Sequence, residues 1–155
     1  MRQLEVRPMI EELDRKIIRV LNRNARKSFR EIAKELGTSV TAVINTVKKL
    51  EASGAIKGYV PIVDREHFGI GLVAVVAARI SRGKLIEAQK KISRDPHVSV
   101  VYDVTGEWDS FIVGHFTGRE DLNAFIKKLL AIPDVDRTVT HIVLNVVKEE
   151  LRAAV

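Results

Sequence analysis

The hydrophobic pattern of this chain changes near residue 64, and this change constrains the fold more than any other feature. Before it, apolar residues recur every three or four positions, which is the period of amphipathic helices. After it, long β-branched runs alternate with helical stretches. We therefore predict a helical domain in residues 1–54, a hinge strand and linker in residues 55–66, and an α+β domain in residues 67–155.

Three helices are predicted in the first domain. The apolar positions between residues 10 and 22 fit one helical stripe, with Asp14 outside it. Ser28 and Glu31 have the spacing of a capping box, in which each side chain accepts a hydrogen bond from the other residue's amide, so the second helix begins after Ser28. Gly37 ends this helix, because glycine most easily takes the left-handed conformation that follows a last turn.

The third predicted helix follows the Gly37 turn, with Ser39 as its cap and Gly54 as its end. Two helices joined by a short glycine turn indicate a helix-turn-helix, although a plain helical bundle gives the same pattern. With Val43 and Val47 turned inward, the opposite face is predicted to read bases in the major groove. That face carries Thr41, Ile44, Asn45 and Lys48.

The charge distribution favours the DNA-reading interpretation over the plain bundle. The net charge is +6, and residues 1–60 carry 13 Lys and Arg against 7 Asp and Glu, whereas residues 61–155 carry 13 of each. All of the positive excess therefore lies in the first domain, as expected for a module that binds a polyanion. The predicted phosphate contacts are Arg23, Arg26, Lys27, Arg30, Thr38 and Ser39.

The second domain has the order βαββαβ and a faint internal repeat at an offset of 37 residues, which relates Pro96 to Pro133. Two such units interleave into a four-stranded antiparallel sheet with both helices on one face, the ferredoxin-like arrangement. Because the strands are apolar on both sides, we expect a second subunit to cover the other face. The predicted strands are 72–80, 98–105, 110–117 and 135–147, and the predicted helices are 84–94 and 119–131.

Other classes of protein receive little support. The chain has no cysteine, and its uncharged apolar stretch Phe68 to Ala78 is too short for a membrane helix. We expect a cytoplasmic protein with no membrane partner. The histidines lack metal-ligand spacing and no glycine-rich phosphate loop is present, so we expect no metal site, no required cofactor and no catalytic residue.

Four segments together resemble the Lrp/AsnC family, the leucine-responsive or feast/famine transcription factors. They are LDRKIIRVLNRNARKSFREIAKELGTS, VKKLEASGAIKGYVPIVDREHFG, VVYDVTGEWDSFIVG and PDVDRTVTHIVLNVVK. The resemblance implies a winged helix-turn-helix, a hinge strand, and a βαββαβ domain that dimerises and often assembles to octamers. The chain departs from the family pattern in the third helix, where Asn45 and Thr46 stand at positions that commonly carry arginine.

The resemblance also implies that a free amino acid binds at the loop carrying the family's G-D/E-x-D motif, here Gly106 to Asp109. Free amides there can receive a carboxylate, while Glu107 or Asp109 can receive an ammonium group. An ordinary hairpin turn, with Trp108 covering an interface, is the alternative. The predicted effector-binding residues are Tyr102, Val104, Thr105, Gly106, Glu107, Trp108, Asp109, Thr138, Thr140 and His141.

The sequence as a whole predicts a sequence-specific, double-stranded-DNA-binding transcriptional regulator. We expect a homodimer that assembles further to an octamer, with a free amino acid as effector. Three alternatives remain open at this point: a DNA-organising protein without operator preference, a ferredoxin-like enzyme, and a stand-alone ligand-binding module. A preference for particular promoter fragments over random DNA separates the first alternative from our prediction, and consumption of a metabolite identifies the second.

Overall fold

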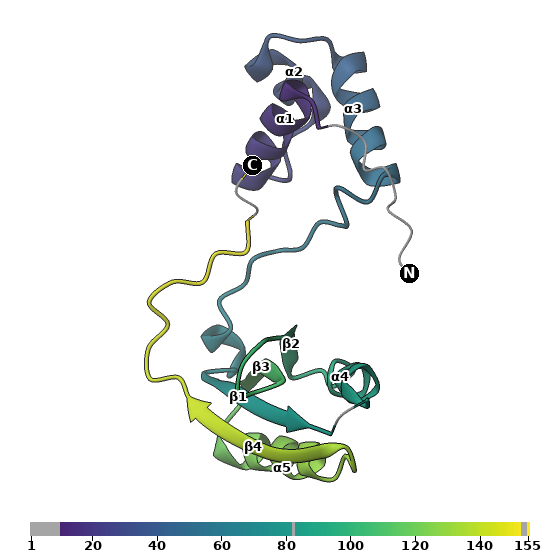
Figure 1. Ribbon diagram of the computed structural model, residues 1–155. Coiled ribbons are helices and arrows are strands. Elements are labelled where there is room, and N and C mark those ends of the chain that lie inside the picture. Colours follow the sequence, from purple (N-terminus) through teal and green to yellow (C-terminus); the bar gives the residue numbers. More distant parts are fainter. Residues whose placement is uncertain (1–9, 82, 153–154) are drawn as a thin grey trace. The chain divides into compact units, whose positions relative to one another are not determined.

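The computed structural model describes residues 10–81, 83–152 and 155. They form two compact units: one contains the chain up to Ile62 together with Glu149–Val155, and the other is Val63–Lys148 (Figure 1). The sequence predicts residues 149–155 as part of the second domain, whereas the structure groups them with the helical unit. There, Arg19 Nε donates a hydrogen bond of 2.8 Å to the carbonyl oxygen of Val155.

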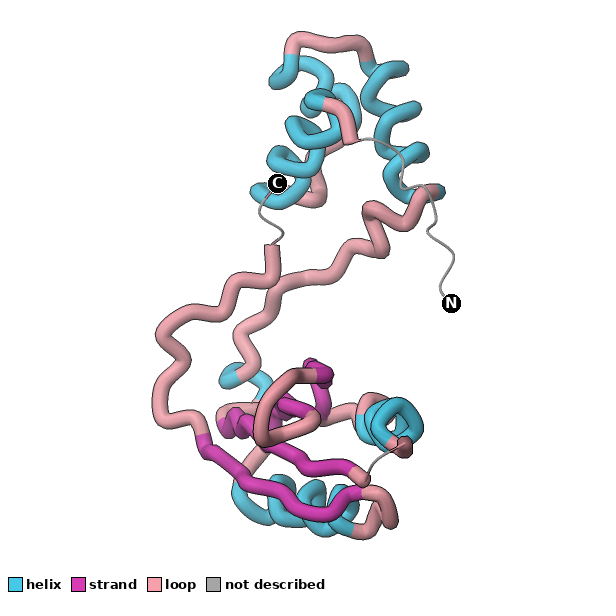
Figure 2. Tube along the Cα trace, viewed as in Figure 1, coloured by secondary structure: helices cyan, strands magenta, loops and turns pink. Residues whose placement is uncertain are grey.

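The hinge, residues 55–66, contains no strand, contrary to our prediction (Figure 2). A strand needs a neighbouring strand to pair with, and within the described part of the chain no strand pairs with this segment. Pro61 also lacks the amide that a ladder requires. The short 3-10 helix η1, Glu66–Phe68, begins at the last residue of the hinge.

The first unit consists of α1 (Glu12–Arg23), α2 (Phe29–Leu36) and α3 (Val40–Ala52). The predicted local signals are confirmed. Ser28 Oγ accepts from the amide of Glu31 at 3.3 Å, while the Glu31 carboxylate accepts from the amide of Ser28 at 2.7 Å. Gly37 ends α2 with a φ of 63°. The buried core of this unit comprises Ile17, Val20, Ile32, Ala33, Val43 and Val47.

Asp14 is buried, whereas the helical pattern had placed it in solvent. Its side chain is 1% exposed because it occupies the third position of α1, where it accepts a 2.8 Å hydrogen bond from the amide of Glu11. Lys49 Nζ on α3 lies 2.9 Å from Asp14 Oδ1. The hydrogen bond to Asp14 raises the pKa of Lys49. The carboxylate therefore both caps α1 and holds α1 against α3.

The second unit has the predicted βαββαβ order, and its antiparallel sheet has the strand order β2-β3-β1-β4 of the ferredoxin-like fold. Its elements are β1 (Leu72–Ile80), α4 (Leu85–Ile92), β2 (Val98–Asp103), β3 (Ser110–Phe116), α5 (Arg119–Leu130) and β4 (Val135–Ile142). The last strand is shorter than predicted. It ends at Ile142 because β1, its only sheet neighbour among the described residues, begins at Leu72.

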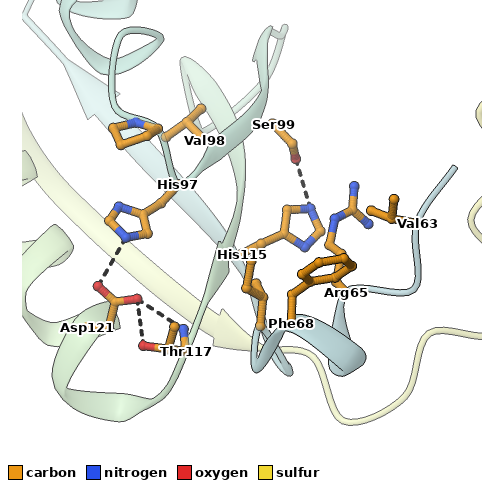
Figure 3. Close-up of a pocket in the computed structure, with 11 residues that line it drawn as sticks. Val63, Arg65, Phe68, His97, Val98, Ser99, His115, Thr117 and Asp121 are labelled. Carbon is orange, nitrogen blue, oxygen red and sulfur yellow. Dashed lines mark hydrogen bonds and ion pairs between the residues drawn. The ribbon is translucent and has the colours of Figure 1, made fainter. Parts of the chain in front are cut away.

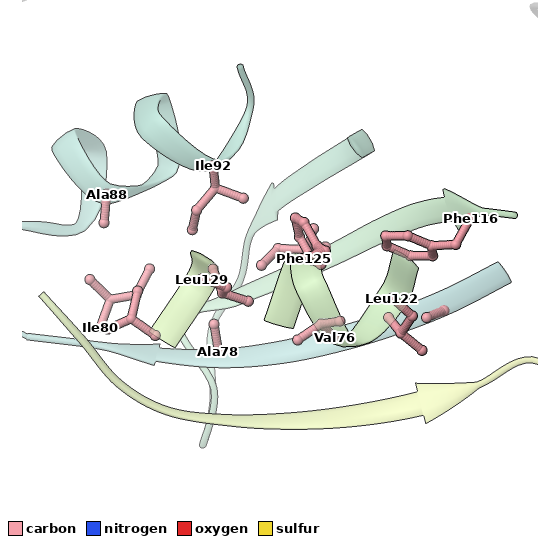
Figure 4. Close-up of a cluster of buried hydrophobic side chains, with 12 residues drawn as sticks. Val76, Ala78, Ile80, Ala88, Ile92, Phe116, Leu122, Phe125 and Leu129 are labelled. Atoms are coloured by element: carbon pink, nitrogen blue, oxygen red, sulfur yellow. The ribbon is translucent and has the colours of Figure 1, made fainter. Parts of the chain in front are cut away.

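The two faces of the sheet differ. Ala74, Val76 and Ala78 of β1 pack with buried side chains of α4 and α5 in one apolar cluster (Figure 4). The alternate residues point to the opposite face. Neither α4 nor α5 packs on that face, which presents the half-buried side chains of Val73, Val75, Phe111, Val113 and Val139.

Candidate DNA interface and effector site

The outer surface of α3 is the candidate base-reading face. Val43, Val47 and Leu50 are at most 2% exposed and turn into the helical core. The helical period then places Thr41, Asn45 and Lys48 in solvent, with Ile44 half-buried beside them. An exposed amide, a hydroxyl and an ammonium group on one helix face provide both donors and acceptors for base edges and phosphates.

Ser39, one of the predicted phosphate contacts, is the N-cap of α3. Ser39 Oγ accepts a 3.1 Å hydrogen bond from the amide of Ala42. Its hydroxyl hydrogen remains able to donate to a phosphate. Thr38 is half-buried, and its amide donates to the carbonyl of Ala33 at 3.0 Å, which closes the turn after α2.

The four predicted basic phosphate contacts fall into two pairs. Arg23 and Lys27 both form ion pairs with Glu35 of α2. The hydrogen bond from Lys27 lowers the pKa of Glu35. Arg26 and Arg30 are exposed, and neither pairs with a carboxylate within the described part of the chain. The sequence did not reveal this division, because Glu35 meets Arg23 and Lys27 through tertiary packing.

The loop of residues 104–109 connects β2 to β3 and is held by the backbone around Asp109. The amide of Val104 donates to the carbonyl of Asp109 at 3.2 Å, and the amide of Asp109 donates to Ala78 of β1 at 3.1 Å. Asp109 Oδ2 also accepts a 2.8 Å hydrogen bond from the amide of Ile80. Asp109 therefore anchors the loop on the sheet, and the exposed carboxylate beside it is that of Glu107.

Several backbone amides at the tip of this loop have no hydrogen-bond acceptor within the described part of the chain. Gly106 has a φ of 119°, a conformation that favours glycine. Within the described part of the chain, the amides of Thr105 to Trp108 donate to no protein acceptor. Trp108 is half-buried. The loop thus offers unpaired amides and a carboxylate within a few residues of each other.

Two arginines that the sequence analysis missed lie against this loop. The Arg79 guanidinium donates a hydrogen bond to the carbonyl of Glu107. The Arg137 guanidinium carbon lies 5.4 Å from the centre of the Trp108 ring. The two arginines come from β1 and β4, and the pairing of these strands brings them opposite each other. No local motif links positions so far apart in the sequence.

The other predicted walls of the effector site do not all come together. Thr138 and Thr140 stand opposite Ala78 and Val76, so they share the sheet face that the helices cover. His141 stands opposite Val75, on the other face. Tyr102 also belongs to that other face, opposite Phe111, and is 60% exposed. Alternate strand residues point to opposite faces, which separates His141 from the two threonines.

A pocket of about 490 Å³ lies at the other end of β2 and β3, where the sequence indicated no site (Figure 3). In its wall, His97 Nδ1 lies 2.7 Å from Asp95 and Nε2 lies 3.1 Å from Asp121, while His115 contacts Ser99 at 3.1 Å. The lining residues are Val63, Arg65, Phe68, Ile70, Pro96, His97, Val98, Ser99, His115, Thr117 and Asp121.

The two carboxylates around His97 are both shifted toward the ionised form. Burial opposes ionisation of Asp95, but hydrogen bonds from the amide and ring of His97 outweigh it and lower the pKa of Asp95. The amide of Thr117 is the main cause of the lowered pKa of Asp121. His97 and the two aspartates serve as hydrogen-bond partners for one another, so this cluster stabilises the fold at this end of the sheet.

Among the described residues, no group of three His, Cys, Asp or Glu side chains is arranged to hold a metal ion. None of the helices in the described ranges combines the length and the apolar character needed to cross a membrane.

Comparison with known proteins identifies both units. The AsnC-type helix-turn-helix domain matches residues 10–51, and the Lrp/AsnC ligand binding domain matches residues 73–153. An uncharacterised HTH-type transcriptional regulator of Pyrococcus abyssi is 44% identical, with 93% of this chain and 98% of the relative covered. HTH-type transcriptional regulator FL11 of Pyrococcus horikoshii is 32% identical, with 93% and 95% covered.

Solved structures share the arrangement of elements. E. coli AsnC has a TM-score of 0.84 at 27% identity, with 92% of this chain and 97% of that chain covered. A transcriptional regulator from Neisseria meningitidis, solved as a complex with L-Met, has a TM-score of 0.85 at 23% identity, with 94% and 97% covered. The sequence matches over both units show that this chain belongs to the Lrp/AsnC family of transcriptional regulators.

Proposed function

We propose that this regulator binds specific DNA sequences as a dimer or larger assembly, and that an amino-acid-type ligand alters its assembly or its DNA binding. The observation that carries the proposal is the loop of residues 104–109. It combines unpaired amides with the exposed carboxylate of Glu107. A zwitterionic ligand requires both kinds of group, one for its carboxylate and one for its ammonium.

In the proposed DNA complex, α3 enters the major groove. Asn45 reads adenine through a donor and an acceptor, and Ile44 contacts a thymine methyl group. Arg26, Arg30 and Lys48 contact phosphates, which position the protein and contribute no sequence information. The direct support for this assignment is the exposure of the polar face of α3 and the helix-turn-helix match.

In the proposed ligand complex, the amides of residues 105–108 receive the α-carboxylate and Glu107 receives the ammonium group. Asp109 already accepts from the amide of Ile80, so its main part is to hold the loop. The ligand-binding-domain match and the L-Met complex of a structurally similar regulator support an amino acid as the ligand class.

We further propose that the apolar sheet face pairs two protomers, and that pairs assemble to an octamer. Two linked helix-turn-helix units raise each other's effective concentration on DNA, and a symmetric pair requires a roughly palindromic site. For the ligand to act as a switch, it must bind one assembly more tightly than another, because equal affinity shifts no equilibrium.

A thermal-shift screen of the full-length protein against the twenty amino acids tests the ligand assignment. A ligand present at 100 times its dissociation constant should add about 2.7 kcal/mol to the stability of the unit it binds. If no amino acid raises the melting temperature, the effector proposal fails and a ligand-independent regulator is the better description.

A second experiment tests operator preference. Binding of the full-length protein to promoter fragments and to random fragments of equal length is measured at several salt concentrations. Specific recognition predicts a preference of at least about a thousandfold for some promoter fragments. Equal affinity for all fragments at every salt concentration instead identifies a DNA-organising protein.

A further inference from the structure

Arg79 of β1 and Arg137 of β4 are directly opposed in the sheet. Like charges at opposed positions of neighbouring strands destabilise a sheet. Both side chains are exposed, and within the described part of the chain neither guanidinium pairs with a carboxylate. The pair is therefore a local concentration of positive charge that no carboxylate of the described residues neutralises through an ion pair.

Contacts with two consecutive loop residues bring both guanidinium groups to the candidate effector loop. Arg79 donates to the carbonyl of Glu107, and Arg137 lies over the ring of Trp108 at 5.4 Å. A guanidinium has five N–H donors, so most of the donors of this pair remain available. A cation–π contact with the aromatic ring restricts the guanidinium before a ligand arrives.

We propose that this pair recognises a second anionic group on the ligand, so that the effector is an acidic amino acid. This inference rests on the proposed function of the loop. The unpaired loop amides receive the α-carboxylate, Glu107 receives the ammonium group, and Arg79 with Arg137 receives the side-chain carboxylate. Three charged groups of the ligand then meet three different sets of partners in one small region.

The alternative to an acidic side chain is a neutral one that leaves the arginine pair facing water. The amide analogues of the acidic amino acids distinguish the two, because asparagine and glutamine match aspartate and glutamate in shape and lack only the charge. Hydrogen bonds between a guanidinium and a carboxylate are among the strongest that proteins form. A site built around them therefore discriminates against the neutral analogue.

The test is isothermal titration of the full-length protein with L-aspartate, L-glutamate, L-asparagine, L-glutamine and L-leucine. We expect one of the acidic amino acids to bind at least about tenfold more tightly than its amide, which corresponds to one charge-assisted hydrogen bond. Arg137→Gln and Arg79→Gln should each abolish this preference. Arg94→Gln removes another exposed arginine, in the turn that follows α4, and should leave this preference unchanged.

Arg137→Lys keeps the positive charge but removes the planar guanidinium that can donate two parallel hydrogen bonds to a carboxylate. It should weaken binding of the acidic amino acid by a smaller factor than Arg137→Gln. Circular dichroism and melting curves of each variant show whether it folds. If Arg137→Gln does not fold, Arg79→Gln and Arg137→Lys carry the test.

The outcomes separate failure of this inference from failure of the proposed function. Equal affinity for an acid and its amide, unchanged in Arg137→Gln, overturns the inference while the loop remains a ligand site. Absence of binding by every amino acid tested, together with a negative result in the wider screen, overturns the proposed function as well. If Arg137→Gln instead changes the mass of the ligand-free assembly in light scattering and no acid preference exists, the pair contacts a partner subunit, which also overturns the inference.

Discussion

Lys49 on α3 and Asp14 at the start of α1 form an ion pair in which Nζ lies 2.9 Å from Oδ1. The lysine end is 41% exposed, but the carboxylate is 1% exposed. The same carboxylate accepts from the amide of Glu11. The pair therefore links the supporting helix to the candidate recognition helix.

Replacing Asp14 with alanine should destabilise the helical unit. The change removes a helix cap and leaves Lys49 without its partner, and hydrogen bonds to charged groups of this kind contribute about 1.5–3 kcal/mol. Urea denaturation followed by circular dichroism measures the loss. Glu12→Ala is the matched control, because Glu12 lies in the same turn of α1 and its contact with Arg19 is 3.8 Å long and exposed. Equal effects of the two substitutions would show that burial of Asp14 contributes nothing.

Arg26 and Arg30 should contribute more to the salt dependence of DNA binding than Arg23. A cation that contacts phosphate releases counterions, and its removal lowers the slope of log affinity against log salt by about 1. Arg26→Gln and Arg30→Gln should show this loss. Arg23→Gln should change the slope less, because Glu35 already neutralises part of the charge of Arg23. Fluorescence anisotropy with one DNA duplex at several salt concentrations provides the slopes.

Glu35, which pairs with Arg23 and Lys27, should weaken DNA binding by neutralising part of their positive charge. Glu35→Gln removes the carboxylate that holds Arg23 and Lys27, so the affinity for DNA should rise at low salt. A decrease would show that the two ion pairs orient Arg23 and Lys27 for phosphate contact.

Much of the fold could be predicted because its signals are local. The capping box of Ser28 and Glu31, the Gly37 turn and the bounds of β1 follow from residues a few positions apart. The four-stranded antiparallel sheet also followed from the internal repeat, which relates Pro96 to Pro133 and indicates two interleaved βαβ units.

The features that escaped prediction depend on pairs brought together by tertiary structure. Asp14 resembles a solvent-facing residue until Lys49, 35 positions away, is placed beside it. Arg79 and Arg137 become neighbours only through the register of β1 and β4. The strands can be predicted from a single sequence, but the register in which they pair cannot.

Asn45 and Lys48 should differ in the kind of DNA affinity that they support. Asn45→Ala should cost about 1–3 kcal/mol on the preferred site and relax the choice of one base pair, because bidentate contacts to base edges discriminate by this amount. Lys48→Ala should weaken binding to all sequences by a similar factor. Selection of bound fragments from a randomised pool, before and after each substitution, measures both effects. A uniform loss in Asn45→Ala would place Asn45 outside the base contacts.

The cluster around His97 should make the second unit sensitive to acid. Asp95 and Asp121 have pKa values lower than those of unfolded carboxyls, so they stabilise the fold fully above about pH 4. This contribution is lost as the pH falls through their lowered pKa values. Lys128 also approaches Asp95, at 4.0 Å, and favours the charged form.

His97→Gln should therefore reduce the melting temperature of the second unit near neutral pH. The difference in melting temperature between this variant and the wild type should shrink as the pH falls and the two aspartates become protonated. Differential scanning calorimetry between pH 2 and pH 7 measures this difference. His67→Gln is the control, because His67 also contacts an aspartate but its side chain is 80% exposed. A difference that stays constant with pH would assign the role of His97 to its stacking on Phe116.

A charge on the helix-free face of the sheet should prevent assembly. Val113 lies on β3 opposite Val75 of β1, in the middle of the apolar face that we propose as the dimer contact. Val113→Glu places a carboxylate there, and burying it without a partner costs several kcal/mol, more than a dimer contact readily tolerates. Light scattering should then show a monomer, and circular dichroism should show unchanged secondary structure. Its DNA affinity should fall, because two helix-turn-helix units no longer bind as one molecule.

Glu120→Lys, an exposed charge change on α5, should leave both the mass and the affinity unaltered. If Val113→Glu has the mass of the wild type, protomers pair through another surface.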